Sequence, residues 1–270
     1  GMRLNYIEKF KKYIAEPRLQ LGYGISKSLN LELLGELKSQ NSQQIIDLQK
    51  DYFGIEKRRW IVSNNGTIPI QKSRQLSLNL FYKKNDWLLD IENFYKKVTG
   101  ITTSSQGFQN QLEFVRTTGG YEIWGTEMLV QKKINHFLTW LSYTYNENNY
   151  NFPNYEYPRF PNNFELTHTL SWAGIYEKNN FKIALGTKWS SGRPKTSPDL
   201  SQIDLSNPVL VYNKPNNSNL NVFYQVNFSS TYKWETEDGI QYKIGISILN
   251  ILNRRNEISE YYRINSLTNS

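Results

Sequence analysis

The sequence contains no cysteine and only two histidines, His136 and His168. The absence of cysteine excludes disulfide bonds, thiolate metal ligands and cysteine nucleophiles together. The chain also lacks any run of about 18 uncharged apolar residues, so it holds no candidate transmembrane helix. Its mean hydropathy of −0.64 agrees with that absence. A membrane β-barrel stays possible, because half-polar strands give a weak hydropathy signal.

Neither histidine lies in a motif for catalysis or metal binding. The sequence has no G-x-S-x-G nucleophile elbow, and no cluster of His, Asp and Glu has the spacing of metal ligands. Both histidines fall in runs of alternating polarity, where a structural or interfacial role is expected. The sequence therefore predicts no catalytic residue, no metal site and no cofactor.

The charge distribution and the aromatic content limit the kinds of partner that the chain is expected to bind. The net charge is +8, but lysine and arginine are scattered among the acids rather than gathered on one face. Nucleic-acid binding needs a clustered basic face, so no nucleic-acid partner is predicted. Aromatics make up 14% of the chain, including 19 tyrosines. Such amphipathic rings suit strand faces and membrane–water interfaces.

Alternating polarity is the dominant pattern, and the run Ile240–Ile248 shows it plainly. Every second residue there is large and apolar, which is typical of a strand with one dry and one wet face. Isoleucines in this run also fall at helical spacing, but Gly245 and the β-branched residues are poor helix formers. The preceding Glu237–Gly239 is a hairpin turn signal, so we expect a strand.

Such runs come in pairs that are joined by short polar turns, which predicts hairpins. The paired runs are Arg18–Ile25 with Leu29–Lys38, Arg74–Tyr82 with Trp87–Val98, Tyr121–Gln131 with His136–Tyr145, Phe164–Tyr176 with Phe181–Trp189, and Asn221–Trp234 with Ile240–Ile248. Met2–Ile7 and a last run near Ile258–Ile264 are added as strands. The total is about 11–12 strands.

Long connections alternate strictly with these short turns. They span Ser39–Ser73, Thr99–Gly120, Asn146–Asn163 and Ser190–Leu220. Loops beyond about 12–15 residues are uncommon in compact domains. Short turns at one end and long loops at the other are the layout of an outer-membrane barrel. A soluble β-sandwich or propeller gives no reason for this alternation. We therefore predict an all-β fold, an antiparallel transmembrane β-barrel.

The apolar stripes carry aromatics at their ends and aliphatic residues in the middle, as expected of girdles around an apolar band about 25 Å tall. Ile246 is expected near the middle of the band, and Tyr242 near the periplasmic interface. Charged residues on the opposite stripe suit a wide lumen. The residues predicted to face lipid are Ile183, Leu185, Val226, Phe228, Ile244, Ile246 and Ile248, and the charged lumen positions are Asp90, Glu92, Lys182, Lys188, Lys233 and Lys243.

Motifs along nearly the whole chain resemble the TonB-dependent outer-membrane receptors, especially forms common in Bacteroidetes. "GMRLNY" is similar to the family's G-x-R-x-D/N-Y strand end, and "EPRLQLGYGIS" to its PR-x-S-x-x-Y strand. "GTEMLVQKK" resembles its G-x-E strand. "WLSYTYN" followed by "FPNNFELTHTLSW" resembles its SYT…FP…D-x-x-H region, with Glu165 near the acidic position and His168 at the histidine. "WSSGRPKTSP" is similar to SG-x-P-x-T, and "GISILNILNRRN" to S-I-x-N-L-L-N-x-x-N.

The resemblance implies a role and a set of partners. Family barrels have about 22 strands around a plug, so residues 1–270 are expected to be the C-terminal portion of the barrel, without the plug domain and signal peptide. The implied function is uptake of a scarce nutrient, such as a siderophore, a cobalamin or a glycan, across the outer membrane. The implied partners are membrane lipid, the plug of the same protein, TonB through the N-terminal part, and a small nutrient ligand. No enzyme activity is implied.

Aromatic and cationic residues in the long loops are candidates for contact with that ligand, because such residues dominate binding hot spots. They are Trp60, Tyr150, Tyr155, Tyr157 and Arg159. Stiffening of exposed loops, or a place in the outer girdle, explains them equally well. Gly192 and Pro194 are expected to form a turn rather than to bind.

Two other readings remain open at this stage. A complete small outer-membrane barrel acting as a lipase or protease predicts a Ser–His pair at its outer edge. A soluble all-β binding module predicts that the apolar stripes pack into a core. For the partial barrel we expect two unpaired edges, with either a curled open sheet or a distorted closure, and no stability in isolation.

Overall fold

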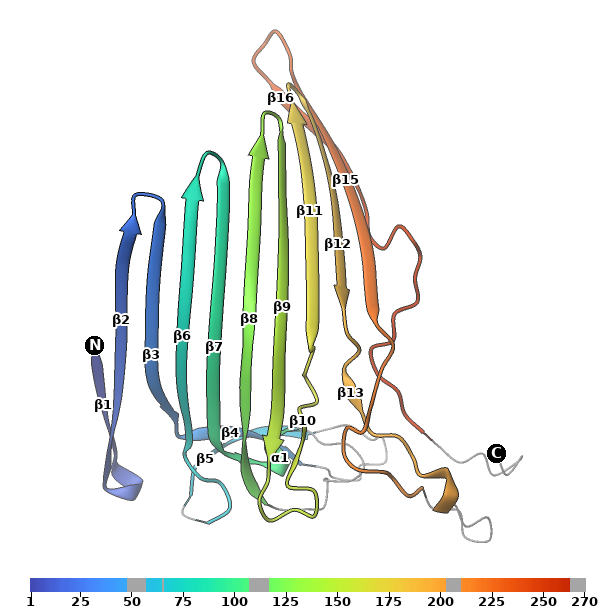
Figure 1. Ribbon diagram of the computed structural model, residues 1–270. Coiled ribbons are helices and arrows are strands. Elements are labelled where there is room, and N and C mark those ends of the chain that lie inside the picture. The colour runs from blue at the N-terminus through green and yellow to red at the C-terminus, as the bar shows by residue number, and fades with distance from the viewer. Residues whose placement is uncertain (48–56, 65, 107–116, 203–209, 263–270) are drawn as a thin grey trace.

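The computed structural model describes residues 1–47, 57–64, 66–106, 117–202 and 210–262. Nearly all of its regular structure is antiparallel β-sheet (Figure 1). One sheet of 12 strands dominates, ordered β1-β2-β3-β6-β7-β8-β9-β11-β12-β15-β16, with β10 attached to β9. The strands of this sheet are β1 (Met2–Ile7), β2 (Lys12–Ser26), β3 (Leu29–Gln40), β6 (Gln71–Lys84), β7 (Trp87–Thr102), β8 (Thr118–Ile134), β9 (Phe137–Asn151), β10 (Arg159–Pro161), β11 (His168–Lys178), β12 (Phe181–Ser190), β15 (Phe223–Glu235) and β16 (Gln241–Ile248).

Each predicted hairpin is present, and its short turn lies at the upper end of the sheet in Figure 1. Between β6 and β7, Asn85 and Asp86 have φ angles of 48° and 61°. Two consecutive positive φ angles are typical of the type I′ turn, whose twist matches that of the flanking strands. The long connections leave the lower ends of the strands. The interleaving of short turns and long loops is thereby confirmed.

Two strand predictions were wrong at their margins. The run near Ile258–Ile264 forms no strand over residues 258–262, and positions 263–264 lie outside the described residues. Its backbone is irregular because Arg193 and Asn221 bind the segment through Ile258 O and the Glu257 side chain instead of a strand ladder. The strand predicted to begin at Phe164 begins instead at His168, the first residue of β11. Residues 164–167 form a local turn, in which the backbone N–H groups of Phe164 and Glu165 donate to Asn162.

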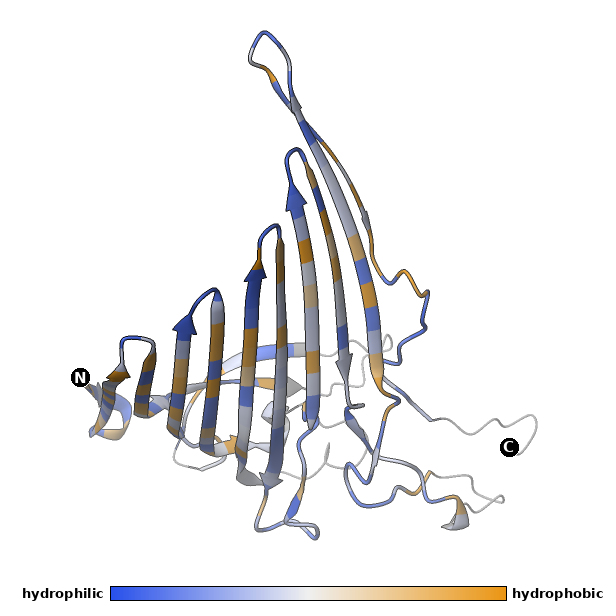
Figure 2. Ribbon diagram, turned by 45° about the horizontal axis from the view of Figure 1, so that its top comes forward, coloured by the Kyte–Doolittle hydropathy of each residue, from blue (hydrophilic) through white to orange (hydrophobic). Residues whose placement is uncertain are grey.

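The register places the alternating apolar residues on one continuous side of the sheet, called here the apolar face. Residues that pair directly across an antiparallel ladder point to the same side. One such row runs Leu33, Leu78, Asn93 and Thr126, and the next runs Leu80, Ile91 and Met128. Further along, Leu185, Phe228 and Ile248 pair in a single row. Figure 2 shows the resulting alternation of hydrophobic and hydrophilic residues along the strands.

Aromatic residues bound this face at both ends of the strands. On β7 and β8, Tyr95 pairs with Trp124 toward the long loops, while Trp87 lies at the short turn. Eight residues separate Trp87 from Tyr95, which at about 3.4 Å per residue is about 27 Å along the strand. On β15, Tyr224 and Tyr232 show the same eight-residue separation. Aromatic residues thus lie at both ends of the strands, as predicted, but Phe228 is an aromatic residue in the middle of the band, between Tyr224 and Tyr232.

The opposite side, called here the polar face, carries the predicted charged residues. Asn79, Glu92 and Glu127 pair in one row across β6, β7 and β8. Basic residues gather at the far side of the sheet: Lys182, Lys188, Lys233 and Lys243 on β12, β15 and β16. The two sides of the sheet therefore differ as the wall of a wide barrel requires.

No second layer covers the apolar face among the described residues. Leu185 is 39% exposed, and Ile244 and Ile246 are 63% and 58% exposed. The packed core that a soluble binding module predicts is absent from this part of the chain. The sheet is curved but open, with β1 and β16 each paired on one side only. Of the two outcomes expected for a partial barrel, the open sheet is the one observed. In the part of the chain described, no helix has the length and apolar character to cross a membrane.

Candidate ligand-binding loops

The long connections form a layer beneath the sheet in Figure 1, and they contain regular structure that the sequence did not reveal. The first holds a hairpin of β4 (Ser42–Asp47) and β5 (Lys57–Val62), and the second begins with the short helix α1 (Thr103–Gln106). The fourth holds the small pair β13 (Pro194–Lys195) and β14 (Ser218–Asn219). These elements give the loops fixed attachment points at one end of the sheet.

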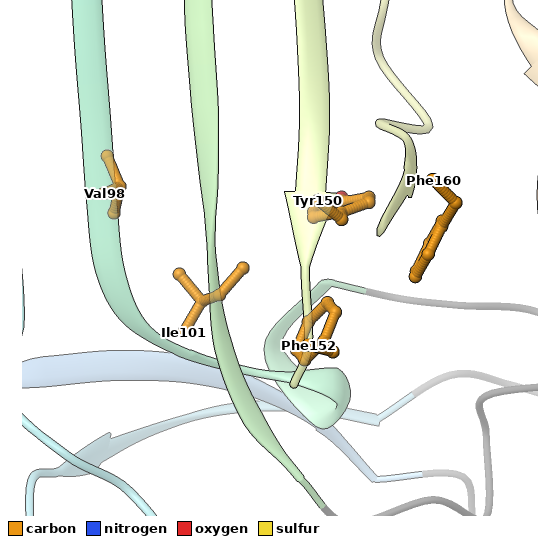
Figure 3. Close-up of a cluster of buried hydrophobic side chains, with 5 residues drawn as sticks. All are labelled: Val98, Ile101, Tyr150, Phe152 and Phe160. Carbon is orange, nitrogen blue, oxygen red and sulfur yellow. The ribbon is translucent and has the colours of Figure 1, made fainter. Parts of the chain in front are cut away.

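A buried aromatic cluster anchors this layer to the sheet (Figure 3). It joins Val98 and Ile101 at the end of β7 to Tyr150 of β9 and to Phe152 and Phe160 of the loop that follows. The rings of Tyr150 and Phe160 lie 5.4 Å apart, and those of Tyr150 and Phe152 lie 5.7 Å apart. These are favourable separations for tilted aromatic pairs. The loop after β9 is thus packed on the sheet rather than extended into solvent.

Tyr150, a predicted ligand contact, lies inside this cluster. Its exposed fraction is 0%, so in this conformation the ring packs in the loop core. The ring is therefore in contact with protein on all sides in this structure, and a direct contact with ligand stays a prediction.

Tyr155, Tyr157 and Arg159 lie next to the cluster and remain accessible. The Tyr155 and Tyr157 rings meet edge to face at 6.1 Å, and Lys214 Nζ lies 5.6 Å from the Tyr157 ring centroid. Arg159 is exposed on β10. The two tyrosines and the lysine therefore form a small cationic aromatic surface, built from connections that are about 60 residues apart in sequence. Lys214 was not predicted.

Trp60 is separate from these residues. It lies on β5, pairs with Gln44 of β4, and is 66% exposed. The hairpin that carries it is fixed by Gln43, whose Nε2 donates to Pro69 O and Gly100 O, both at 2.7 Å. Gln43 is buried. The indole is thereby presented on an anchored hairpin.

Asn216 joins the third and fourth connections. Its Nδ2 donates to Pro161 O and to Asn163 Oδ1, both at 2.7 Å, although Asn216 lies more than 50 residues away in sequence. Its φ of 55° is in the left-handed region, which asparagine tolerates better than most residues. This clamp was missed in the sequence because one asparagine among many carries no distinctive pattern.

Gly192 and Pro194 do not form the predicted turn: Gly192 lies in irregular backbone and Pro194 begins strand β13. A Cβ at Gly192 would lie 1.6 Å from Leu220 O, so only glycine allows the two segments of this connection to approach. Pro194 pairs with Asn219 in the small ladder that follows.

The histidines have structural surroundings. His168 Nδ1 lies 2.8 Å from the Tyr143 hydroxyl, and its ring packs against Tyr143 and Tyr145 at the aromatic end of the apolar face. Ser191 Oγ accepts from the His168 backbone N–H at 3.1 Å and is not bonded to the imidazole. His136 packs against Tyr176 beside a short turn. The Ser–His pair of the enzyme reading is therefore not formed at His168.

Glu165 is the acid in this region with an altered proton affinity. Burial raises the pKa of its carboxyl, and the donation from Thr167 Oγ1 at 3.0 Å opposes that rise. Within the described residues, no group of three His, Asp or Glu side chains is placed to hold a metal ion. Among the described residues, these loops present aromatic, cationic and amide groups, which are suited to noncovalent recognition.

No protein-family model and no curated protein sequence matches the chain. Solved structures do match in fold. The ferric citrate transporter FecA matches with a TM-score of 0.62 and 12% identity, covering 90% of this chain and 34% of FecA. The ferric yersiniabactin uptake receptor FyuA from Yersinia pestis matches with a TM-score of 0.62 and 10% identity, covering 93% of this chain and 34% of FyuA.

A third match is the ferric-catecholate import receptor Fiu from E. coli K12, with a TM-score of 0.59 and 12% identity, covering 91% of this chain and 32% of Fiu. The chain thus spans about a third of the length of the structures that it matches. At these identities the likeness concerns the fold. The open sheet has the architecture of part of the β-barrel of such receptors.

Proposed function

We propose that residues 1–270 form the C-terminal part of the barrel of a TonB-dependent receptor, which imports a scarce nutrient across the outer membrane. The observation that carries this proposal is the exposed apolar face, continuous across the sheet and bounded at both ends by aromatic residues. In lipid, a barrel presents such a band, flanked by aromatic girdles, to the hydrocarbon. In water, an uncovered face of this extent would drive association.

The proposed orientation follows from the loop lengths. The short turns would face the periplasm and the long loops the exterior. The individual residues of β12, β15 and β16 that were predicted to face lipid all belong to the apolar face in the observed register. The polar face would line the lumen.

The polar face also supports a plug domain as its occupant. Asn79 Oδ1 and Asp90 Oδ1 are buried and have no hydrogen-bond donor among the described residues. Buried acceptors without donors are costly. A plug within the lumen would supply the donors, and the parts of the protein outside this chain would contact TonB. The motif resemblance to Bacteroidetes forms of the family supports the same assignment.

For the nutrient we propose a ferric chelate, ahead of a cobalamin or a glycan. Support comes from the matched receptors, which are named for ferric citrate, ferric yersiniabactin and ferric catecholate. In the loops, Trp60, Tyr155 and Tyr157 would stack on the chelator, and Arg159 and Lys214 would attract its negative charge. Tyr150, through its buried ring, would stabilise the loop that carries Tyr155 and Tyr157.

Growth of cells that depend on the full-length receptor tests this function. Deletion of its gene should abolish growth on one ferric chelate as sole iron source, and the wild-type gene should restore it. Growth on cobalamin or on glycan supplied in parallel should not change. A restored strain carrying Trp60→Ala with Tyr157→Ala should need a higher chelate concentration. Unimpaired growth of the deletion strain on every chelate, cobalamin and glycan offered would refute uptake by this protein.

A further inference from the structure

The strand ladder between β15 and β16 is incomplete toward the long loops. β16 ends at Ile248 and pairs with β15 only from Phe228 toward the short turn, whereas β12 pairs with β15 as far as Phe223. Asn250 and Asn253 end the ladder, because their φ angles of 52° and 48° lie in the left-handed region and turn the chain out of the extended conformation. The loop end of β15 therefore has no strand partner on its β16 side among the described strands.

The segment that follows, residues 254–260 and called here the strap, occupies this gap with side chains. The side-chain amide of Asn256 takes the place of a strand residue: its Oδ1 accepts from Tyr224 N–H and its Nδ2 donates to Tyr224 O, both at 3.0 Å. Arg254 Nη2 donates to Val222 O at 3.2 Å. Within the described residues, no backbone–backbone hydrogen bond joins the strap to β15.

The strap also binds both ends of the fourth connection, which runs between β12 and β15. At the start of that connection, Lys195 Nζ donates to the Glu260 carboxylate and Arg193 donates to a strap carbonyl. Where the connection returns to β15, both carboxylate oxygens of Glu257 accept from Asn221, one from its N–H at 3.2 Å and one from its Nδ2 at 2.7 Å. One segment thus fastens β15 and the fourth connection together.

Polar side chains provide nearly all of this attachment. Every residue of the strap except Asn256 is exposed, and Ile258 is 70% exposed. An exposed Lys–Glu pair such as Lys195 with Glu260 contributes little to stability. Segments with few buried apolar contacts and with exposed hydrogen bonds open at a lower free energy than the strands beside them. The strap is therefore expected to open while β15 stays paired with β12.

We propose that the strap is a releasable element of the fold: residues 254–260 detach from β15 and from the fourth connection as one unit, without breaking a strand ladder. In a whole barrel a following strand would pair with β16, and the strap would still meet β15 through side chains. After release, the fourth connection, which carries Lys214, would follow the third connection, to which Asn216 binds it. Any effect on a ligand at Lys214 rests on the proposed function, whereas the release itself does not.

Residue-resolved hydrogen exchange of the full-length protein in nonionic detergent, without ligand, tests the release. In wild type, the Tyr224 and Asn221 amides, which the strap holds, should share one protection factor, and that factor should be lower than that of Thr231 in the ladder of β15. This measurement needs no variant. Equal protection of Tyr224 and Thr231 would overturn the proposal.

Two variants test whether the strap opens as a unit. Asn256→Ala leaves Tyr224 N–H without its acceptor and should speed its exchange about tenfold or more, with Thr231 unchanged. The variant K195Q/E260Q acts at the far end of the strap and should still speed exchange at Tyr224, by about two- to fivefold. The matched control E177Q/K182Q removes another exposed Lys–Glu pair, 3.1 Å apart and remote from the strap, and should leave Tyr224 unchanged.

Three results with these variants would also overturn the proposal. They are unchanged exchange at Tyr224 in Asn256→Ala, an effect of K195Q/E260Q confined to the residues next to those two positions, and faster exchange along the whole of β15 in Asn256→Ala. The last would show that the strap and the strand ladder open together. A failure of the proposed function appears separately, in the growth test, and leaves these exchange rates unaffected.

Discussion

If the apolar face lies in lipid, as proposed, an arginine in its middle should destabilise the proposed receptor by an amount that depends on its depth. Leu185 is the best position, because Phe181 and Trp189 lie four residues to either side on the same face of β12. At about 3.4 Å per residue, each aromatic is about 14 Å away along the strand. Leu185 also pairs with Phe228, which lies midway between Tyr224 and Tyr232 on β15. The aromatic residues of β12 and β15 therefore place the midpoint of the apolar band at the same pair, Leu185 and Phe228.

The expected cost of Leu185→Arg is ~2–4 kcal/mol, the range for arginine at the bilayer midplane. Ala184→Arg puts the same side chain at the same depth on the polar face, away from lipid, where the cost should be much smaller. Ile246 was expected near the midplane, but it pairs with Ser230, two residues on the turn side of Phe228. Ile246→Arg should therefore cost less than Leu185→Arg. Ile248, which pairs with Phe228, is the residue of β16 at the midpoint.

The assay is reversible urea unfolding of the full-length receptor folded into phosphatidylcholine vesicles. The three variants should rank Leu185→Arg, Ile246→Arg, Ala184→Arg in order of decreasing destabilisation. Equal costs for Leu185→Arg and Ala184→Arg would show that the two faces meet the same environment, and would contradict a lipid-facing band. A larger cost for Ile246→Arg than for Leu185→Arg would contradict the assigned depth.

Three further predictions concern the loops. Tyr150→Ala should lower the stability of the loop after β9 by ~3 kcal/mol or more, because a fully buried ring is lost, and limited proteolysis should detect it; Tyr150→Phe, which keeps the ring, should cost about 1 kcal/mol. Asn216→Asp removes two donated hydrogen bonds and should lower the stability of the loops, measured with the same protease, by ~1–3 kcal/mol. Asn217→Asp removes one exposed hydrogen bond, from Asn217 Nδ2 to Ser197 Oγ, and should have a smaller effect. Burial raises the pKa of the Glu165 carboxyl, so the protonated form favours the folded loop and the charged form opposes it. The stability of the loop should therefore fall as the pH rises above the ordinary range of a glutamate. A flat wild-type profile, or an equal slope in Glu165→Gln, would contradict this.

Apart from β10, which lies within a predicted loop, the sheet could be predicted from the sequence because its strands repeat a local signal. Period-two alternation, as from Tyr242 to Ile248, fixes which residues share a face, and tight turns such as Asn85–Asp86 fix which strands are neighbours. The ends of the strands were harder to predict. Where the chain passes beyond the aromatic rows, both faces meet polar surroundings and the alternation fades, so β7 and β8 continue past the predicted limits to Thr102 and Thr118.

The loop layer was predictable only in part, because its contacts join residues far apart in sequence. Trp60, Tyr155 and Tyr157 are accessible in the structure, whereas Tyr150 is buried. Nothing local distinguishes Tyr150 from Tyr157, since both are tyrosines in an Asn- and Pro-rich stretch. The difference comes from Phe152 and Phe160, which close over Tyr150 after the chain has turned back to pair as β10.

The length of the central strands has a mechanical consequence. Crossing a bilayer takes about 9–11 tilted residues, but β7 and β8 have 16 and 17. Past Tyr95 and Trp124, roughly six residues continue on each strand, or about 20 Å of hydrogen-bonded sheet. With the apolar face in lipid, as proposed, this part of the sheet would form a rigid collar between the bilayer and the loops. We expect the loops to keep their positions when the bilayer thins or thickens, because the collar, and not the lipid surface, sets their height.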